Sequence, residues 1–249
     1  MMKADFWRKR WVEGQIGWHR QSVNPQLEKW WPQLGARSGA PVLMPLAGKS
    51  LDVHWLMDQA HPVLAVELSE IATAEFFAEA NVQPRVDQIG QFERSTADGL
   101  SFLSGDIFEL DARCMQDFKQ QQKSLNQPGD DSQQPWAWYD RAALVALPPE
   151  TRQRYMRHLA QLLPPHSVGL LLSFEYPQHE TDGPPFAVEE QEVRRLCDGL
   201  FECELLEREI LLDPQQPPSA KELLVKPNRY VEKGMTRAAE AIYRLQRMP

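Results

Sequence analysis

Few features of this chain point to disulfide bonds or to a bound metal. The 249 residues include only three cysteines, Cys114, Cys197 and Cys203, and no two of them have C-x-x-C spacing. An odd number of scattered cysteines favours reduced thiols over a disulfide framework or a structural zinc site. Because no cluster of side chains has metal-ligand spacing, we also predict no metal cofactor.

The chain also lacks a long hydrophobic run and an excess of basic residues. No segment approaches the roughly 20 apolar residues of a membrane-spanning helix, and the N-terminal segment MMKADFWRKRW lacks the apolar centre of a signal peptide. The net charge is −8, from 27 basic and 35 acidic residues, which disfavours binding to phosphate-rich polymers. We therefore expect a cytoplasmic, monomeric protein that binds a small molecule, with no nucleic-acid or membrane partner.

Apolar runs alternate with amphipathic stretches along most of the chain, which predicts a parallel sheet covered by helices in one α/β domain over 1–249. The expected strands cover 41–46, 62–67, 101–104, Trp138 with 142–147, 168–174, 202–211 and 241–245. The expected helices cover 49–60, 70–81 with Ser69 as N-cap, a segment that begins at 148–150, and 188–200. The run 168–174 is apolar throughout, which is typical of a central strand buried on both faces.

Two segments fall outside this pattern. Residues 1–24 combine a helical pattern with a dense group of tryptophans, and we interpret them as a helical lid over the ligand. The alternative is that these rings complete the core and hold the segment in place. The segment KQQQKSLNQPGDDSQQP (119–135) can bury little apolar surface, so we interpret it as a flexible, dispensable insertion.

The loop after the first expected strand is where a ligand should bind, since ligands of open parallel sheets lie beyond the carboxyl ends of the strands. This loop, LMPLAGKSLDVHWL (43–56), has a single glycine, Gly48. A P-loop would need a further glycine where Leu43 stands, and a dinucleotide site would need G-x-G-x-x-G. S-adenosylmethionine carries no phosphate, so the loop suits it better. A dinucleotide-dependent oxidoreductase remains the weaker alternative.

Glu67 ends the second expected strand, 19 residues beyond Gly48. A carboxylate at this position can accept two hydrogen bonds from the 2′ and 3′ hydroxyls of a ribose. One acidic residue is a weak motif by itself, and the alternative is an ordinary surface glutamate at a strand end.

Five segments in order resemble bacterial thiopurine S-methyltransferases and span nearly the whole chain. They are FWRKRWVEGQIGWH (6–19), VLMPLAGKSLDVHWL (42–56), VLAVELSEIATAEFF (63–77), YDRAALVALPPETRQRY (139–155) and DGPPF (182–186). The resemblance implies the class I S-adenosylmethionine-dependent methyltransferase fold. This fold is Rossmann-like, with helices on both faces of a mostly parallel seven-stranded sheet whose last strand is antiparallel.

The resemblance also implies methyl transfer from S-adenosylmethionine to the sulfur of an aromatic or heterocyclic thiol, and it extends to selenium and tellurium species. The implied cofactor contacts fall on Trp11, Leu46, Glu67, Asp106, Ile107 and Arg141, and the implied substrate contacts on Trp18 and Arg141, with Phe186 as a further candidate. We assign no catalytic base, because an acidic thiol needs positioning more than deprotonation. A non-catalytic protein that kept the cofactor pocket is a second open alternative.

Overall fold

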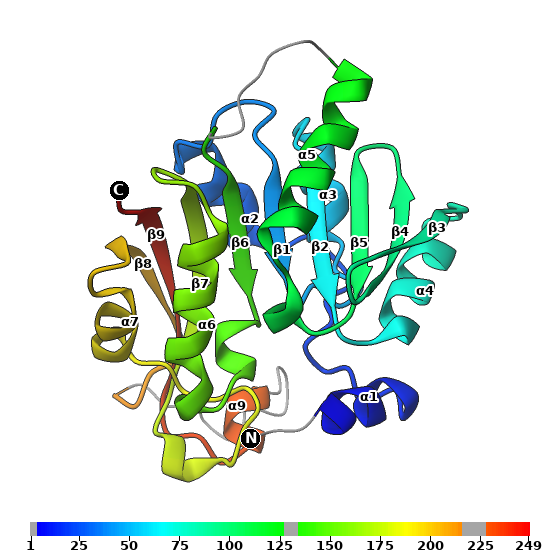
Figure 1. The fold of residues 1–249 in the computed structure, drawn as a ribbon. Coiled ribbons are helices and arrows are strands. Elements are labelled where there is room, and N and C mark those ends of the chain that lie inside the picture. Colours follow the sequence, from blue (N-terminus) through cyan, green and yellow to red (C-terminus); the bar gives the residue numbers. More distant parts are fainter. Residues whose placement is uncertain (1–3, 127–133, 216–227) are drawn as a thin grey trace.

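A computed structural model describes residues 4–126, 134–215 and 228–249, and Figure 1 shows a single sheet with helices packed on both of its faces. The strands are β1 Val42–Pro45, β2 Val63–Glu67, β3 Arg85–Ile89, β4 Phe92–Ala97, β5 Leu100–Ser104, β6 Ala137–Arg141, β7 Val168–Glu175, β8 Phe201–Leu212 and β9 Ala238–Arg247. The helices are α1 Ala4–Val12, α2 Pro25–Trp30, α3 Asp52–Asp58, α4 Glu70–Glu79, α5 Ala112–Asn126, α6 Pro149–Leu162, α7 Glu190–Cys197 and α9 Arg229–Glu232.

The sheet has the strand order β3-β4-β5-β2-β1-β6-β7-β9-β8 in the described ranges. β5, β2, β1, β6 and β7 are parallel neighbours, and β9 enters antiparallel between β7 and β8. The expected parallel centre and antiparallel last strand are therefore present. The expected number of seven strands is wrong, because the hairpin β3–β4 pairs antiparallel with β5 and extends that edge by two strands.

Alternate residues of the central strands face two separate apolar layers. Leu43 of β1 packs into a layer that contains side chains of α5, α6 and α7, whereas Val42 and Met44 pack into a layer with side chains of α2, α3 and α4. This arrangement follows from the two-residue period of a strand. Both faces of β1 and β2 are buried, which accounts for their continuously apolar sequences.

The expectation of a flexible insertion at 119–135 needs correction over 119–126, where the chain is helical. These residues form the last turns of α5, which Met115 and Phe118 anchor in the core. The ammonium of Lys119 donates to the carbonyl of Gln134 at 3.2 Å and lies 5.7 Å from the ring centroid of Trp136. Gln and Lys are good helix formers, so a polar composition did not exclude a helix here. Residues 127–133 lie outside the described residues.

The expected strand over 142–147 is also wrong. β6 ends at Arg141, Ala142 takes a positive φ of 64°, and a 3₁₀ helix covers Leu144–Ala146. The backbone N–H of Leu144 donates to the carboxylate of Asp140 at 3.0 Å, which holds the chain in this turn. The run is apolar because these residues are buried, and burial alone does not distinguish a strand from a tight helical turn.

Other boundaries agree closely with the expected ones. Ser69 caps α4 by accepting a hydrogen bond from the backbone of Ala72, as predicted. α3 begins at Asp52 rather than 49, and α7 is shorter than the expected 188–200.

None of the helices in the described ranges combines the length and the apolar character needed to cross a bilayer.

Candidate functional site

A pocket of about 670 Å³ lies at the carboxyl ends of the central parallel strands. This size is within the usual range of small-molecule sites. Seven of the eight residues singled out from the sequence as ligand contacts line it: Trp11, Trp18, Leu46, Glu67, Asp106, Ile107 and Arg141. They come from the N-terminal segment, from the last residues of β2 and β6 and from the loops after β1 and β5, so the fold brings distant parts of the sequence to one place. Their roles toward a ligand stay predictions.

Glu67 is the most firmly positioned of these residues. Its Oε2 accepts a hydrogen bond from the backbone N–H of Gly48 at 2.8 Å, and its Oε1 accepts one from Ser69 at 2.8 Å. Burial raises the pKa of this carboxyl, while bonds from the N–H groups of Ser69, Gly48 and Leu68 oppose the rise. The side chain is only 7% exposed, so the alternative of a surface glutamate is wrong. A carboxylate has about four acceptor sites, so acceptor capacity remains for a further donor from a ligand.

The loop after β1 turns sharply beside Glu67. Leu46 has a positive φ of 48° and Gly48 one of 57°, a region in which glycine is favoured. A Cβ atom at Gly48 would lie 3.4 Å from Cζ2 of Trp11 and 3.8 Å from Nε1 of Trp18. These are ordinary van der Waals distances, so the glycine is required by the turn rather than by the two indole rings.

Lys49, the lysine of the Gly-Lys-Ser triplet, forms ion pairs with two glutamates, so its position does not indicate phosphate binding. The Nζ atom of Lys49 lies 2.8 Å from Glu75 and 2.6 Å from Glu79, both on α4. These ion pairs connect the loop to α4, the helix after β2. They support the sequence argument that this loop is not a P-loop.

The aromatic N-terminal segment covers one side of the pocket. Trp7 and Trp18 meet edge to face with ring centroids 5.3 Å apart, and Trp11 and Trp18 do so at 5.8 Å. Trp11 is only 5% exposed, yet it also lines the pocket. The two interpretations of this ring are thus compatible, because it packs on the protein and presents a surface to the cavity.

Adjacent residues at the end of β6 point to opposite sides, as expected for a strand. Arg141 reaches the pocket and donates from Nη1 to the backbone carbonyl of Trp18 at 2.7 Å, which ties β6 to the N-terminal segment. Asp140 is buried on the other side, where Tyr155 donates its hydroxyl to the carboxylate at 2.8 Å. Burial raises the pKa of Asp140 to about 6.

The loop after β5 forms a further part of the wall. The carboxylate of Asp106 accepts a hydrogen bond from the backbone N–H of Phe108 at 3.0 Å, and Ile107 is 5% exposed. His158 lies 2.9 Å from the carbonyl of Ile107, and burial lowers the pKa of this histidine. The guanidinium of Arg154 stacks over Phe108 at 4.0 Å from the ring centroid. This wall combines a flat apolar surface with one free carboxylate oxygen.

Several lining residues were not found from the sequence. They are Arg10 on α1, Pro184 and Pro185, and the group Arg229, Tyr230, Lys233 and Met235 in and after α9. The signal that could have located the last group is an aromatic and basic stretch directly before a predicted strand. Phe186, a candidate lining residue, is not in the pocket wall; its ring packs against Gly183 and lies 5.8 Å from the guanidinium of Arg152.

Comparisons with protein families and curated proteins give one consistent result. The family model described as "Thiopurine S-methyltransferase (TPMT)" matches residues 2–121 and 130–248. The thiopurine S-methyltransferase of Pseudomonas aeruginosa (strain UCBPP-PA14) is 40% identical over 246 residues, which cover 99% of this chain and 100% of the relative. That of Xanthomonas axonopodis pv. citri (strain 306) is 41% identical over 246 residues, with the same coverage.

Solved structures support the fold class. A 1,6-didemethyltoxoflavin-N1-methyltransferase from Burkholderia thailandensis, solved with S-adenosylhomocysteine, matches with a TM-score of 0.58 at 16% identity and covers 99% of this chain and 87% of that one. An S-adenosylmethionine-dependent methyltransferase from Anabaena variabilis also gives a TM-score of 0.58, at 12% identity, with coverages of 98% and 94%. The class I methyltransferase fold expected from the sequence is thereby confirmed.

Proposed function

Because the chain belongs to the thiopurine S-methyltransferase family, we propose that its pocket holds S-adenosylmethionine against Glu67 and presents the methyl group to the sulfur of an aromatic or heterocyclic thiol. The chain is a methyltransferase that uses S-adenosylmethionine, so neither a dinucleotide-dependent oxidoreductase nor a non-catalytic binding protein describes it. What remains to be assigned is how individual residues hold the two ligands.

The position of Glu67 carries the assignment of the cofactor site. Backbone N–H groups fix its carboxylate at the pocket wall, and its remaining acceptor capacity suits a ribose hydroxyl. The flat wall at Asp106 and Ile107 is the proposed place for adenine, with the free oxygen of Asp106 as an acceptor for an amino group.

The other end of the cofactor is an amino acid, and Arg141 is the proposed partner of its carboxylate. A guanidinium can bind a carboxylate through two parallel hydrogen bonds. The Nη1 atom of Arg141 is already engaged by the carbonyl of Trp18, so this arginine would couple the N-terminal segment to the ligand. Trp11 and Trp18 would then close the pocket over it.

When bound, S-adenosylmethionine supplies an electrophilic methyl group on a positively charged sulfonium. An acceptor thiolate would form the new bond to carbon in line with the bond that breaks, after its proton has gone to solvent. The residues would act by position, because aligning reacting groups can contribute roughly 7–11 kcal/mol. The apolar wall with Trp7, Trp11 and Trp18 would exclude water, and the charge of Arg141 would favour the thiolate form of the acceptor. Softer selenium and tellurium nucleophiles fit the same scheme.

The finer assignments of partner and compartment are proposals too. We expect a cytoplasmic monomer that acts on free small molecules, supported by the acidic net charge and by the lack of a membrane-spanning helix in the described ranges. Multi-angle light scattering on the purified protein checks the oligomeric state, and a dimer mass would contradict this expectation.

Calorimetry tests the cofactor site directly. S-adenosylhomocysteine should bind with 1:1 stoichiometry and raise the melting temperature, because a ligand that binds only the folded chain stabilises it. NAD should do neither. A subsequent methyl-transfer screen should detect turnover with thiophenol and with a heterocyclic thiol. The proposal would be wrong if S-adenosylhomocysteine did not bind or if neither thiol were methylated.

A further inference from the structure

Part of the pocket wall comes from segments that do not follow β1, β2 or β5. These segments are α1, the Pro184–Pro185 turn, and the stretch from α9 to Met235, and Figure 1 shows α1 and α9 beyond the carboxyl ends of the strands. The Tyr230 ring lies 5.6 Å from that of Phe174, which places α9 at the end of β7. β7 is three strands away from β2 and Glu67, or roughly 14 Å along the sheet. This distance separates α9 from the proposed ribose site.

Cationic side chains gather in the pocket without ion-pair partners. Five of them line it, and none forms an ion pair within the ranges that the structure describes: Arg10, Arg141, Arg154, Arg229 and Lys233. All four arginines have neutral partners, namely the carbonyl of Trp18, the ring of Phe108, the hydroxyl of Tyr230 and, for Arg10, the ring of Phe6 at 4.8 Å. Lys233 is exposed and its ammonium forms no hydrogen bond to the described residues, and the Nε atom of Arg10 is buried without a hydrogen-bond partner among them.

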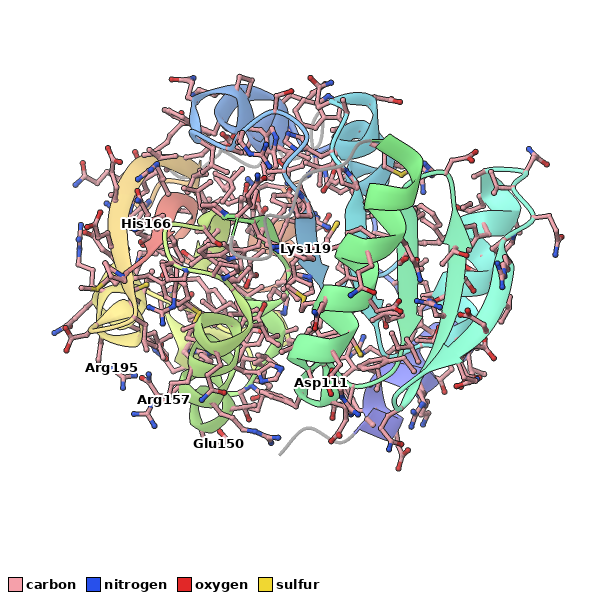
Figure 2. The ribbon with its side chains drawn as sticks, turned by 45° about the horizontal axis from the view of Figure 1, so that its top comes forward. Asp111, Lys119, Glu150, Arg157, His166 and Arg195 are labelled. Carbon is pink, nitrogen blue, oxygen red and sulfur yellow. The ribbon has the colours of Figure 1, made fainter. Side chains whose placement is uncertain are left out.

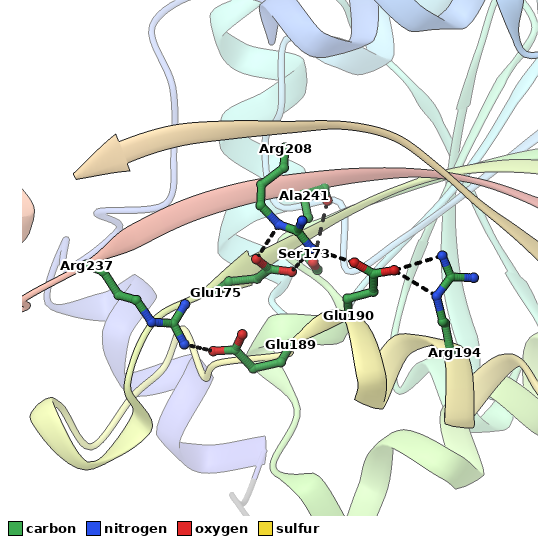
Figure 3. A network of polar contacts seen from close by, with 8 residues as sticks. All are labelled: Ser173, Glu175, Glu189, Glu190, Arg194, Arg208, Arg237 and Ala241. Carbon is green, nitrogen blue, oxygen red and sulfur yellow. Dashed lines mark hydrogen bonds and ion pairs between the residues drawn. The ribbon is translucent and has the colours of Figure 1, made fainter. Parts of the chain in front are cut away.

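Arginines just outside the pocket behave in the opposite way. Figure 3 shows that they are neutralised by glutamates of β7 and of the start of α7. Arg208 bonds Glu175 at 2.8 Å and Glu190 at 2.6 Å, and Arg237 bonds Glu189 at 2.7 Å. The chain has more acidic than basic residues, so a shortage of carboxylates does not explain the unpaired cations of the pocket.

The carboxylates that line the pocket do not balance these cations. Glu67 is bound by backbone N–H groups, Asp106 accepts from the backbone of Phe108, and Asp5 lies 3.9 Å from Arg8. Glu240 is the fourth; burial raises its pKa, and the charges of Arg141 and Arg229 oppose the rise, so Glu240 offsets these two arginines but not Arg10 or Lys233. The cofactor adds a sulfonium and an ammonium against a single carboxylate, so its arrival increases the positive charge. The cations of α1 and α9 are therefore available to an anionic group of a second ligand.

We propose that Lys233, together with Arg10, selects thiol acceptors that carry an anionic substituent, such as an aromatic thiol with a ring carboxylate. This inference rests on the proposed function and deepens it. The acceptor would be fixed at two points, with its sulfur next to the methyl group of the cofactor and its anionic substituent at Lys233. Arg141 is left for the cofactor. Lys233 and Arg10 line the pocket from two different segments of the chain. The anionic substituent of an acceptor ring between Trp18 and Tyr230 could therefore bind either side chain.

Two acceptors with the same ring and the same thiol, only one of them charged, isolate the effect of the anionic substituent. The kcat/KM values for 4-mercaptobenzoate and 4-mercaptobenzamide are compared in the wild type and in Lys233→Gln, Arg10→Gln and the double variant. The intrinsic reactivity of the two thiols cancels in the ratio between proteins. Each single substitution should lower the preference for the carboxylate about tenfold, mainly through KM, which is the usual scale of a lost hydrogen bond to a charged group. Turnover of the amide should fall much less than turnover of the carboxylate, because the amide carries no charge for either side chain to bind.

Arg157→Gln is the control, because Arg157 is an exposed arginine on α6 that does not line the pocket (Figure 2). It removes the same charge from the molecule and should leave the preference unchanged. Unchanged S-adenosylhomocysteine affinity in Lys233→Gln would show that this variant is folded. A carboxylate preference that survives in both single variants and in the double variant would overturn the inference. Failure of the wild type to methylate either thiol would instead count against the proposed function.

Discussion

The two parts of the pocket wall differ in how their charged groups are held. In the part built from the ends of β2 and β5, Glu67 and Asp106 are fixed by backbone N–H groups at hydrogen-bond distance. In the part built from α1 and α9, Arg10 and Lys233 lack ion-pair partners within the described ranges. Fixed groups suit a ligand that is always the same, whereas unpaired side chains suit acceptors that vary. The comparison predicts that substitutions in the two parts affect different measurements.

Removing the N-terminal segment should have the largest effect on turnover. A chain that lacks residues 1–21 but keeps Asn24, which caps α2, should fold while methyl transfer falls about a thousandfold. Trp11, Trp18 and the bond between Arg141 and the Trp18 carbonyl would be lost, so S-adenosylhomocysteine should also bind more weakly. Circular dichroism and a methyl-transfer assay check this. An unfolded product would favour the core interpretation of these rings, and a fully active one would contradict both.

The wall between the two parts should show a distinct pH dependence of stability. Asp140 holds the 142–147 turn, and burial raises its pKa in the folded protein from the ordinary 3.8 to about 6. The stability that the protonated carboxyl of Asp140 contributes to the folded state is therefore fully present below about pH 4 and is lost as the pH rises through 6. Relative to Asp140→Asn, the wild type should lose up to about 3 kcal/mol of unfolding free energy between pH 4 and pH 7. Urea unfolding at several pH values measures this difference. Parallel curves for the two proteins would contradict it.

Replacing Glu67 tests the fixed part of the wall. Glu67→Gln should weaken the binding of S-adenosylhomocysteine by about 1.5–3 kcal/mol, because hydrogen bonds to a charged acceptor are lost. It should leave the choice between anionic and neutral thiols unchanged, which is the reverse of the result expected for Lys233→Gln. Glu70→Gln on the exposed first turn of α4 is the matched control for calorimetry. Equal affinities in all three proteins would show that the ribose is held elsewhere.

The smallest effect is expected far from both parts. Replacing only residues 127–133 with a short Gly-Ser link should leave cofactor binding and melting temperature unchanged, because their polar, Gly- and Pro-containing sequence can bury little apolar surface. Replacing all of 119–135 should lower the melting temperature, since it also removes the end of α5 and the contact of Lys119 with Gln134. A thermal scan of both proteins checks this. Equal melting temperatures would show that the end of α5 adds nothing to stability.

Sequence reasoning succeeded where one physical requirement dominated. β7 is buried on both faces, so its residues had to be apolar, and the run 168–174 located it. Glu67 was placed at the pocket because it ends a strand and follows a loop with a single glycine, Gly48; its contact with a ligand stays a prediction. In both cases a short stretch of sequence, with the rule that sites lie at the carboxyl ends of parallel strands, was enough.

The features that were missed depend on contacts across the fold. The hairpin β3–β4 is an edge with exposed polar positions such as Arg85 and Glu93, so it lacks the apolar signal of a central strand. Residues 142–147 are apolar like a strand, yet the long-range bond from Tyr155 to Asp140 supports a turn. The stretch from Arg229 to Met235 reaches the pocket only because β9 carries it past the end of β7.

The insertion of β9 between β7 and β8 sets an order of events during synthesis. β7 and β8 cannot be joined until the final residues of the chain have left the ribosome, because β9 supplies the ladder to each of them. Domains form as units during translation, and distant pairings form late. α9 immediately precedes β9, so the wall that carries Lys233 should be the last part of the pocket to mature. A nascent chain arrested before Ala238 would already hold Glu67 and Gly48 but would have no complete place for an acceptor.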